Sequence, residues 1–140
     1  MCGDDGKAAP WMFSVLLQGY PNLEYIIIDG GSSDRTMEIV KKYEPWLTCW
    51  TSESDAGQSD AISKGFSKSN GRILSWLNSD DFLEENALGR VAAAFAAADE
   101  HVGAVVGMGC WINEFARPIN TIFQWKYRGI LCCGWPWTPR

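Results

Sequence analysis

The chain has 140 residues, 46% of them hydrophobic, and its 12 basic and 17 acidic residues give a formal net charge of −5. This length suits one domain that buries roughly 70% of the surface of its unfolded chain, and the acidic excess argues against nucleic-acid or anionic-membrane partners. No apolar run approaches the roughly 20 residues that span a bilayer. Asp4 and Asp5 stand where a secretory signal would carry positive charge, so we expect a cytoplasmic protein without a transmembrane segment.

Cysteine and histidine give few signals of chemistry. The five cysteines are odd in number and include no Cys-x-x-Cys pair, which favours reduced, mostly buried thiols over a zinc site or a disulfide framework. The single histidine, His101, follows polar residues in a predicted loop. We expect its side chain to be solvated and to have no catalytic role.

The first part of the chain predicts a helix, a strand and a second helix. Pro10 suits a first helical turn, and apolar side chains follow it at helical spacing up to Gly19. Residues 23–29, "LEYIIID", are a β-branched run typical of a buried strand, and the glycine-rich turn 30–34 follows. Residues 35–43 carry apolar side chains at steps of three, which predicts an amphipathic helix.

The second part continues the alternation of strands and helices. Strands are predicted at residues 47–52 and 72–78 and, last, at residues 102–107. Between them, apolar side chains at helical spacing predict helices over residues 61–66 and 88–98. This order predicts an α/β fold with a mainly parallel sheet flanked by helices.

Carboxylates follow three of the predicted strands. Asp29 ends one strand, Asp55 follows the next, and Asp80 and Asp81 follow the third within "ILSWLNSDDF". Ligands of parallel sheets collect at the carboxyl ends of the strands. Aspartate pairs are also common in turns and helix caps, so the pair alone is a weak signal, but three chain segments would bring acids to one edge.

Together with "DGGSSD" and "SDAGQSDAISKG" in this order, the acidic pair makes residues 14–120 resemble the family 2 glycosyltransferases. The resemblance implies a GT-A-type nucleotide-diphospho-sugar transferase fold, incomplete at both ends. Residues 1–13 would be a loose segment and helix start, and residues 121–140 an aromatic, cysteine-containing tail. It further implies a nucleotide-diphosphate sugar donor, an acceptor that the sequence does not identify, Mn²⁺ or Mg²⁺, and inverting transfer of a hexosyl group.

The resemblance also implies a metal ligand. The family's Asp-x-Asp pattern falls on Asn78, Ser79 and Asp80, so Asp80 is the expected ligand of the cation. A hard cation prefers carboxylate and phosphate oxygens and would neutralise the leaving diphosphate. Asp81 would orient Asp80, contact a sugar hydroxyl, or cap a helix beginning near Glu84.

Donor-binding residues are implied on the same basis. Asp29 matches the first acid of the family's Asp-Asp-Gly-Ser turn, and Gly30 replaces the second. Asp60 would otherwise be a helix N-cap and Gln58 a solvated loop residue. The implied set is Asp29, Gly30, Asp55, Gly57, Gln58, Asp60, Ser79 and Asp81.

Three features keep a non-enzymatic hypothesis open. No segment matches the family's first strand, and no residue matches its catalytic carboxylate, so the catalytic residue is unidentified. The tail "ILCCGWPWTPR" carries aromatic side chains that would favour self-association. The alternative is therefore a homo-oligomeric or partner-binding unit, whereas a dehydrogenase-type nucleotide binder is disfavoured because no Gly-x-Gly-x-x-Gly motif follows a strand.

Overall fold

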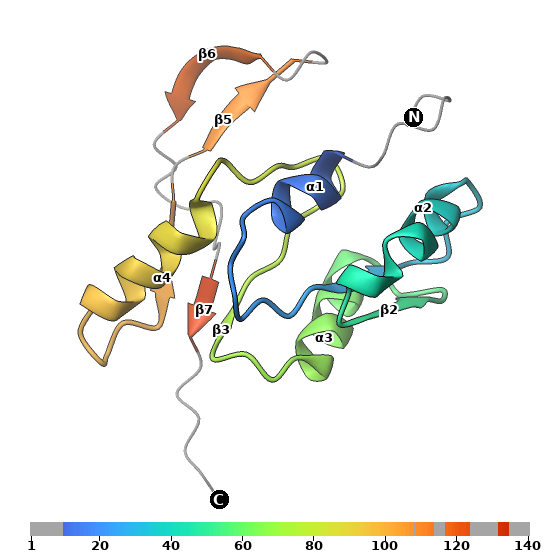
Figure 1. Cartoon of the computed structure of the whole chain (residues 1–140), viewed down its shortest axis with the longest axis horizontal. Helices are drawn as coiled ribbons and strands as arrows, with labels where there is room; N and C mark the ends of the chain where they lie inside the picture. Colours follow the sequence, from blue (N-terminus) through green and yellow to red (C-terminus); the bar gives the residue numbers. More distant parts are fainter. Residues whose placement is uncertain (1–9, 108, 114–116, 124–131, 135–140) are drawn as a thin grey trace, which may run out of the picture.

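The computed structural model describes residues 10–107, 109–113, 117–123 and 132–134 (Figure 1). The elements in these residues are α1 (Pro10–Leu16), β1 (Ile26–Asp29), α2 (Thr36–Lys42), the 3₁₀ turn η1 (Glu44–Trp46), β2 (Cys49–Ser52), α3 (Gln58–Lys68), β3 (Ile73–Leu74), α4 (Ala87–Ala97), β4 (Ala104–Val105), β5 (Gly109–Ile112), β6 (Pro118–Phe123) and β7 (Cys132–Gly134). Strands and helices alternate through the first half, as the sequence predicts.

Strands β1 and β2 form a parallel pair. Their register runs from Ile26 opposite Cys49 to Asp29 opposite Ser52. The Glu53 amide continues the ladder by donating to the Asp29 carbonyl at 3.0 Å. The connection between the two strands contains α2, which is the βαβ arrangement expected of parallel neighbours.

Helices cover both faces of this parallel pair. Successive strand residues point to opposite faces, and Ile27 packs with Met12 of α1 and Val40 of α2. Ile28 faces α3, where a Cβ on Gly65 would lie 3.5 Å from its side chain. Figure 1 shows α2 and α3 beside the pair. The predicted α/β class is therefore confirmed.

The hydrophobic core centres on these same elements. Met12, Ile27 and Val40 are 1%, 7% and 0% exposed. Because β1 is a run of isoleucines between two amphipathic helices, each element buries its apolar side on the others. α1, α2 and β1 therefore pack as one unit, and this packing positions the carboxyl end of β1 in space.

The later strands depart from the predicted parallel sheet. Residues 72–78 and 102–107 contribute only the two-residue strands β3 and β4, and both pair antiparallel with β7. Within the described residues, parallel pairing is limited to β1 and β2. Trp76 packs edge-on against Phe66 of α3 with ring centroids 6.3 Å apart, so the chain after β3 follows α3 instead of extending the sheet.

Strands β5 and β6 form an antiparallel pair that the sequence did not predict. The predicted tail at residues 121–140 is described only at residues 121–123 and 132–134. Cys49 and Cys110 are free thiols. In the part of the chain that the structure describes, no helix is long and apolar enough to cross a membrane.

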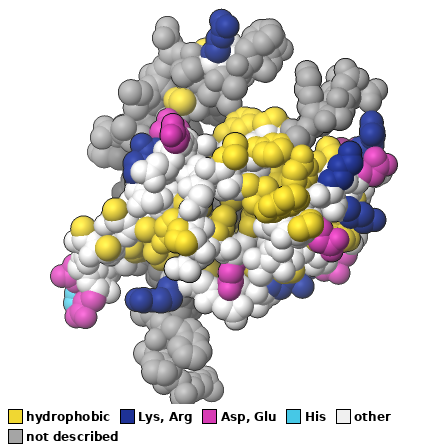
Figure 2. Space-filling view, in the orientation of Figure 1, with side chains coloured by type: hydrophobic (Ala, Val, Ile, Leu, Met, Phe, Trp, Pro, Cys, Tyr) yellow, Lys and Arg dark blue, Asp and Glu magenta, His cyan; other side chains and the backbone are white. Residues whose placement is uncertain are grey.

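An apolar surface lies over α1 and the neighbouring end of α2. Figure 2 shows hydrophobic side chains gathered there, and Leu17 and Trp46 are 79% and 61% exposed. Together with Phe13, Leu16 and Tyr43 they line a groove of about 230 Å³. None of the predicted donor-binding residues lines this groove.

Candidate functional site

Asp29, at the carboxyl end of β1, is buried and accepts four hydrogen bonds. The amides of Gly31 and Ser32 donate to it at 3.1 and 2.9 Å, and the hydroxyls of Ser32 and Ser52 donate at 2.5 and 2.6 Å. Burial raises the pKa of Asp29, but these hydrogen bonds outweigh burial and hold the pKa below its ordinary value. The carboxylate therefore stays ionised and fixes the turn after β1 to the end of β2.

Gly30 brings the first acidic segment against the second. A Cβ at this position would lie 2.7 Å from Oδ2 of Asp55, closer than such atoms approach. The Asp55 carboxylate thus lies over the backbone of Gly30, where a side chain at position 30 would stand. The second acid of the family's motif is absent here, and a carboxylate from the following loop lies beside its place.

Asp55 also shapes the start of α3. Its Oδ1 accepts the Gly57 amide at 2.8 Å, which closes a short side-chain turn. Gly57 has a φ of 111°, in the region that favours glycine, and it directly precedes α3. The sequence "DAG" therefore turns the chain sharply between β2 and α3.

The Asp60 side chain makes contacts at the start of α3. Its Oδ2 accepts the Ala56 amide at 3.1 Å and lies 3.1 Å from Nζ of Lys64. These two contacts lower the pKa of Asp60, and hydrogen bonds to Asp60 and Glu53 raise the pKa of Lys64. Gly57, and not Asp60, is the N-cap residue, but Asp60 does satisfy an amide just before the helix.

The acidic turn, which we define as residues 78–81, is closed by the Asp81 amide, which donates to the Asn78 carbonyl at 3.1 Å. The Asn78 side chain accepts from Nε2 of Gln58 at 2.6 Å and donates to Oδ2 of Asp81 at 3.0 Å. A carboxylate could not donate the second bond. Asn78 therefore connects the start of α3 to Asp81.

Asp80 and Ser79 complete the acidic turn and are exposed. Asp80 makes no hydrogen bond or ion pair with any described residue, in contrast to Asp29, Asp60 and Asp81. The suggestion that Asp81 caps a helix near Glu84 is wrong, because α4 begins at Ala87 and Asn86 precedes it as the N-cap residue.

The three acidic segments are thus joined in space. Asp55 lies over Gly30, Gln58 follows Asp55 by three positions, and Gln58 is bonded to the acidic turn through Asn78. Sequence reasoning missed Asn78 as a connecting residue and Ser52 as a partner of Asp29. The only signal for either was its position directly at the end of a predicted strand.

These strand-end acids on an α/β fold agree with the comparisons to known proteins. The sequence profile of glycosyl transferase family 2 matches residues 11–132, and the chain belongs to this family. A probable glycosyltransferase of Bacillus subtilis is 35% identical over 133 residues, covering 84% of this chain. An uncharacterized glycosyltransferase of Mycobacterium tuberculosis is 39% identical over 69 residues, covering 49% of this chain.

The matched parts make up 31% of the Bacillus protein and 26% of the mycobacterial protein. The chain therefore spans less than a third of the length of these relatives. No solved structure matches it.

The family implies a divalent cation, and the acidic turn is the place to test for one. Among the described residues, no group of three or more Asp, Glu, Cys or His side chains is arranged to hold a metal ion. The described residues therefore do not form a metal cage from protein ligands alone. Mg²⁺ is commonly held by one or two carboxylates, with substrate phosphates and water supplying the other ligands, and the unbonded carboxylate of Asp80 fits a shared site of that kind.

Proposed function

We propose that the chain carries the donor-binding part of a glycosyltransferase, which takes a nucleotide-diphosphate sugar at the edge formed by the three acidic segments. The observation that carries the proposal is the connected series from Gly30 through Asp55 and Gln58 to Asn78 and Asp81. Membership of family 2 supplies the class of reaction.

The residues of this edge would have different tasks. Asp29 and Asp60 are hydrogen-bonded to protein partners, so they would stabilise the turns of this edge more than contact the donor. Asp55 is half-buried, and its Oδ2 lies over the Gly30 backbone, which suits a contact to the nucleoside. Ser79 and Asp81 would contact the sugar or the diphosphate.

Asp80 would hold Mn²⁺ or Mg²⁺ together with the diphosphate of the donor. When bound, such a cation neutralises charge on the departing diphosphate. Because Asp80 makes no hydrogen bond or ion pair with the residues that the structure describes, its carboxylate can turn toward the cation at little cost in lost contacts. The net charge of −5 disfavours an anionic donor, and a bound cation would offset this repulsion locally.

The transfer step would invert the configuration at the anomeric carbon of the sugar. The acceptor hydroxyl would attack from the face opposite the diphosphate while a general base removes its proton. No described residue is assigned as that base. Donor binding is accordingly the part of the reaction that this chain can be tested for directly.

Calorimetric titration with uridine and guanosine diphosphates, with and without Mn²⁺, tests the proposal. We expect binding that requires Mn²⁺ and that weakens at least about 10-fold in Asp80→Ala. The variant loses the contact between the carboxylate and the cation, and polar contacts to charged groups contribute about 1.5–3 kcal/mol. Glu100→Ala removes an exposed carboxylate elsewhere and should leave binding unchanged. Binding that is independent of Mn²⁺, or no binding at all, contradicts the proposal.

A further inference from the structure

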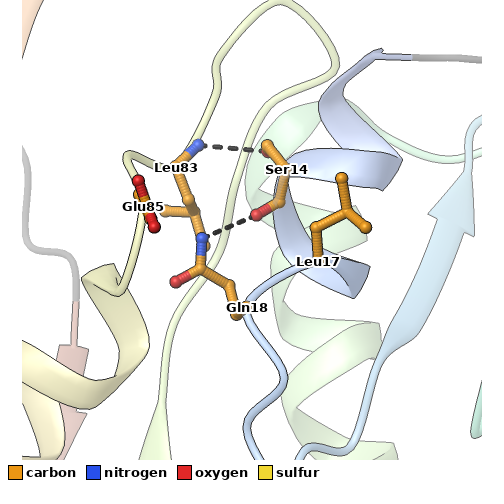
Figure 3. A pocket seen from close by; sticks show the side chains of 5 residues that line it. All are labelled: Ser14, Leu17, Gln18, Leu83 and Glu85. Carbon is orange, nitrogen blue, oxygen red and sulfur yellow. Dashed lines mark hydrogen bonds between the residues drawn. The ribbon is translucent and has the colours of Figure 1, made fainter.

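Helix α1 and the turn that follows it are hydrogen-bonded to the chain just after the acidic turn. The Leu83 amide donates to Oγ of Ser14 at 3.1 Å, and Nε2 of Gln18 donates to the Glu84 carbonyl at 2.9 Å. The Leu88 amide donates to Oε1 of Gln18 at 3.2 Å. Figure 3 shows Ser14 and Gln18 on α1 and the turn that follows it, facing Leu83. We call these three bonds the α1 brace.

Gln18 also acts as a tertiary cap for α4. Leu88 lies in the first turn of α4, where amides have no partner within the helix. Asn86, the residue before the helix, has a left-handed backbone with φ 56° and makes no capping side-chain bond. Gln18 supplies the missing acceptor from a position 70 residues away.

The amide of Gln18 is fully used in this arrangement. Nε2 donates to the Ser14 carbonyl at 2.8 Å as well as to Glu84, and Oε1 accepts from Leu88. A primary amide has two donor hydrogens and one acceptor oxygen. A glutamate at this position could keep the bond to Leu88 but would lose both donors.

The acidic turn therefore lies between two anchors. On one side Gln58 of α3 holds Asn78 at 2.6 Å, and on the other side Ser14 holds Leu83, two residues after Asp81. The four residues between the anchors, 79–82, are exposed. Their position thus depends on the anchors more than on burial.

A cavity adjoins the α1 brace, so loss of the brace would leave room for movement. It measures about 360 Å³ and is lined by Ser14, Leu17, Gln18, Leu83 and Glu85 (Figure 3). Side chains in dense packing cannot shift without clashes, but Leu83 and Glu85 border this open volume. Without its bonds, the segment could move toward the cavity.

We propose that Ser14 and Gln18 are positioning residues that fix the acidic turn from its carboxyl side and so orient Asp80 and Asp81 toward the cation and diphosphate. This role rests on the donor-binding function proposed above. It assigns a task in donor binding to α1, which contributes none of the acids.

The test compares Gln18→Ala, Gln18→Glu and the control Leu17→Ala by two measurements. The first is amide hydrogen exchange at Asp81 and Leu88 without ligand, and the second is titration with uridine diphosphate and Mn²⁺. Loss of one hydrogen bond corresponds to about a 5-fold change. We expect Asp81 to exchange at least about 5-fold faster in Gln18→Ala, with binding about 10-fold weaker.

The variants separate positioning from simple loss of stability. Gln18→Glu should restore protection at Leu88 but not at Asp81, and should bind as weakly as Gln18→Ala. Leu17 borders the same cavity but makes no bond of the α1 brace. The Leu17→Ala variant should therefore match the wild type in both measurements. A lowered melting temperature in Gln18→Ala with unchanged Asp81 exchange and unchanged binding would overturn the inference.

The outcome also separates this inference from the donor-binding proposal. If the wild type binds the nucleotide and Gln18→Ala binds equally well, the inference alone fails. If the wild type does not bind, donor binding fails, and Asp81 exchange alone decides whether the brace positions the turn. Faster exchange then supports positioning, and unchanged exchange overturns it.

Discussion

Gly30 shows how a single residue decides the shape of the candidate site. The absence of a side chain allows the Asp55 carboxylate to lie over the backbone, 2.7 Å from where a Cβ would be. The nearest atoms belong to the end of a side chain that can rotate, so a methyl group here should displace Asp55 rather than unfold the turn. The residue therefore matters for binding more than for stability.

We predict that Gly30→Ala weakens binding of uridine diphosphate and Mn²⁺ several-fold and changes the free energy of unfolding by less than about 1 kcal/mol. In an Asp55→Ala background the same substitution should have little further effect on binding, because the displaced carboxylate is already gone. Gly103→Ala, where nothing lies within 4 Å of the added carbon, is the matched control. Additive losses in the double variant would contradict this account.

At the scale of elements, the end of the parallel pair is fixed by one carboxylate. Asp29 on β1 accepts the hydroxyl of Ser52 on β2 as well as donors from its own turn. Hydrogen bonds to a charged acceptor are among the stronger ones in proteins. The pair β1–β2 is short, so this contact supports both strands and the loop that holds Asp55.

The lowered pKa of Asp29 predicts a pH dependence of stability. Its folded-state pKa lies below the unfolded value of about 3.9, so the carboxylate contributes stability that is fully present above pH about 4. That stability is lost as the pH falls through the folded-state pKa. In urea unfolding at several pH values, Asp29→Asn should lower the free energy of unfolding by about 1–3 kcal/mol at pH 7. Below pH 4, the free energy of unfolding should decline less steeply in the variant than in the wild type. An equally steep decline in the variant would rule out Asp29 as the source.

The helix termini show what local patterns can and cannot specify. α3 is preceded by "DAG", whose Asx turn and left-handed glycine are readable from sequence. The first turn of α4, by contrast, is capped by Gln18 of a distant segment. The suggestion of a helix start near Glu84 was wrong, because Asn86 has a left-handed backbone and α4 begins only after it, at Ala87. Before that point, Leu83 and Glu84 are held by Ser14 and Gln18.

At the scale of the whole molecule, one small cluster joins the elements that carry the site. Met12, Ile27 and Val40 come from α1, β1 and α2. Val40 is completely buried. Because α1 braces the acidic turn and β1 carries Asp29, this cluster sets the distance between the two sides of the candidate site.

We predict that Val40→Ala lowers the free energy of unfolding by about 2 kcal/mol, since it leaves a cavity where three elements meet. Val102→Ala, at a position that is 39% exposed, removes the same two methyl groups near the surface and should cost less than about 0.5 kcal/mol. Urea unfolding followed by circular dichroism measures both. Equal losses would mean that the cluster does not dominate stability.

The alternative of a homo-oligomeric or partner-binding unit stays a prediction. It depended on the absence of a match to the family's first strand and on the aromatic tail, which lies mainly outside the described residues. The exposed apolar side chains of Leu17 and Trp46 belong to a different part of the chain.

The sequence by itself determined the α/β class, the order of the α-helices and strands from α1 to α3 and the placement of acids after three strands. These features follow from side-chain periodicity, β-branching and turn residues, which act over a few neighbouring positions. Strand pairing beyond β1 and β2 was not predictable, because β3 and β4 pair with β7, which lies far along the chain.

The tertiary structure decided how the acids are used. Ser52 binds Asp29, Asp55 covers Gly30, Asn78 links Gln58 to Asp81, and Gln18 holds the segment after the acidic turn. Apart from the bond between Asn78 and Asp81, these contacts join residues 20 to 70 positions apart. Such pairs depend on where the packed core directs the chain, and no local pattern of the sequence encodes that path.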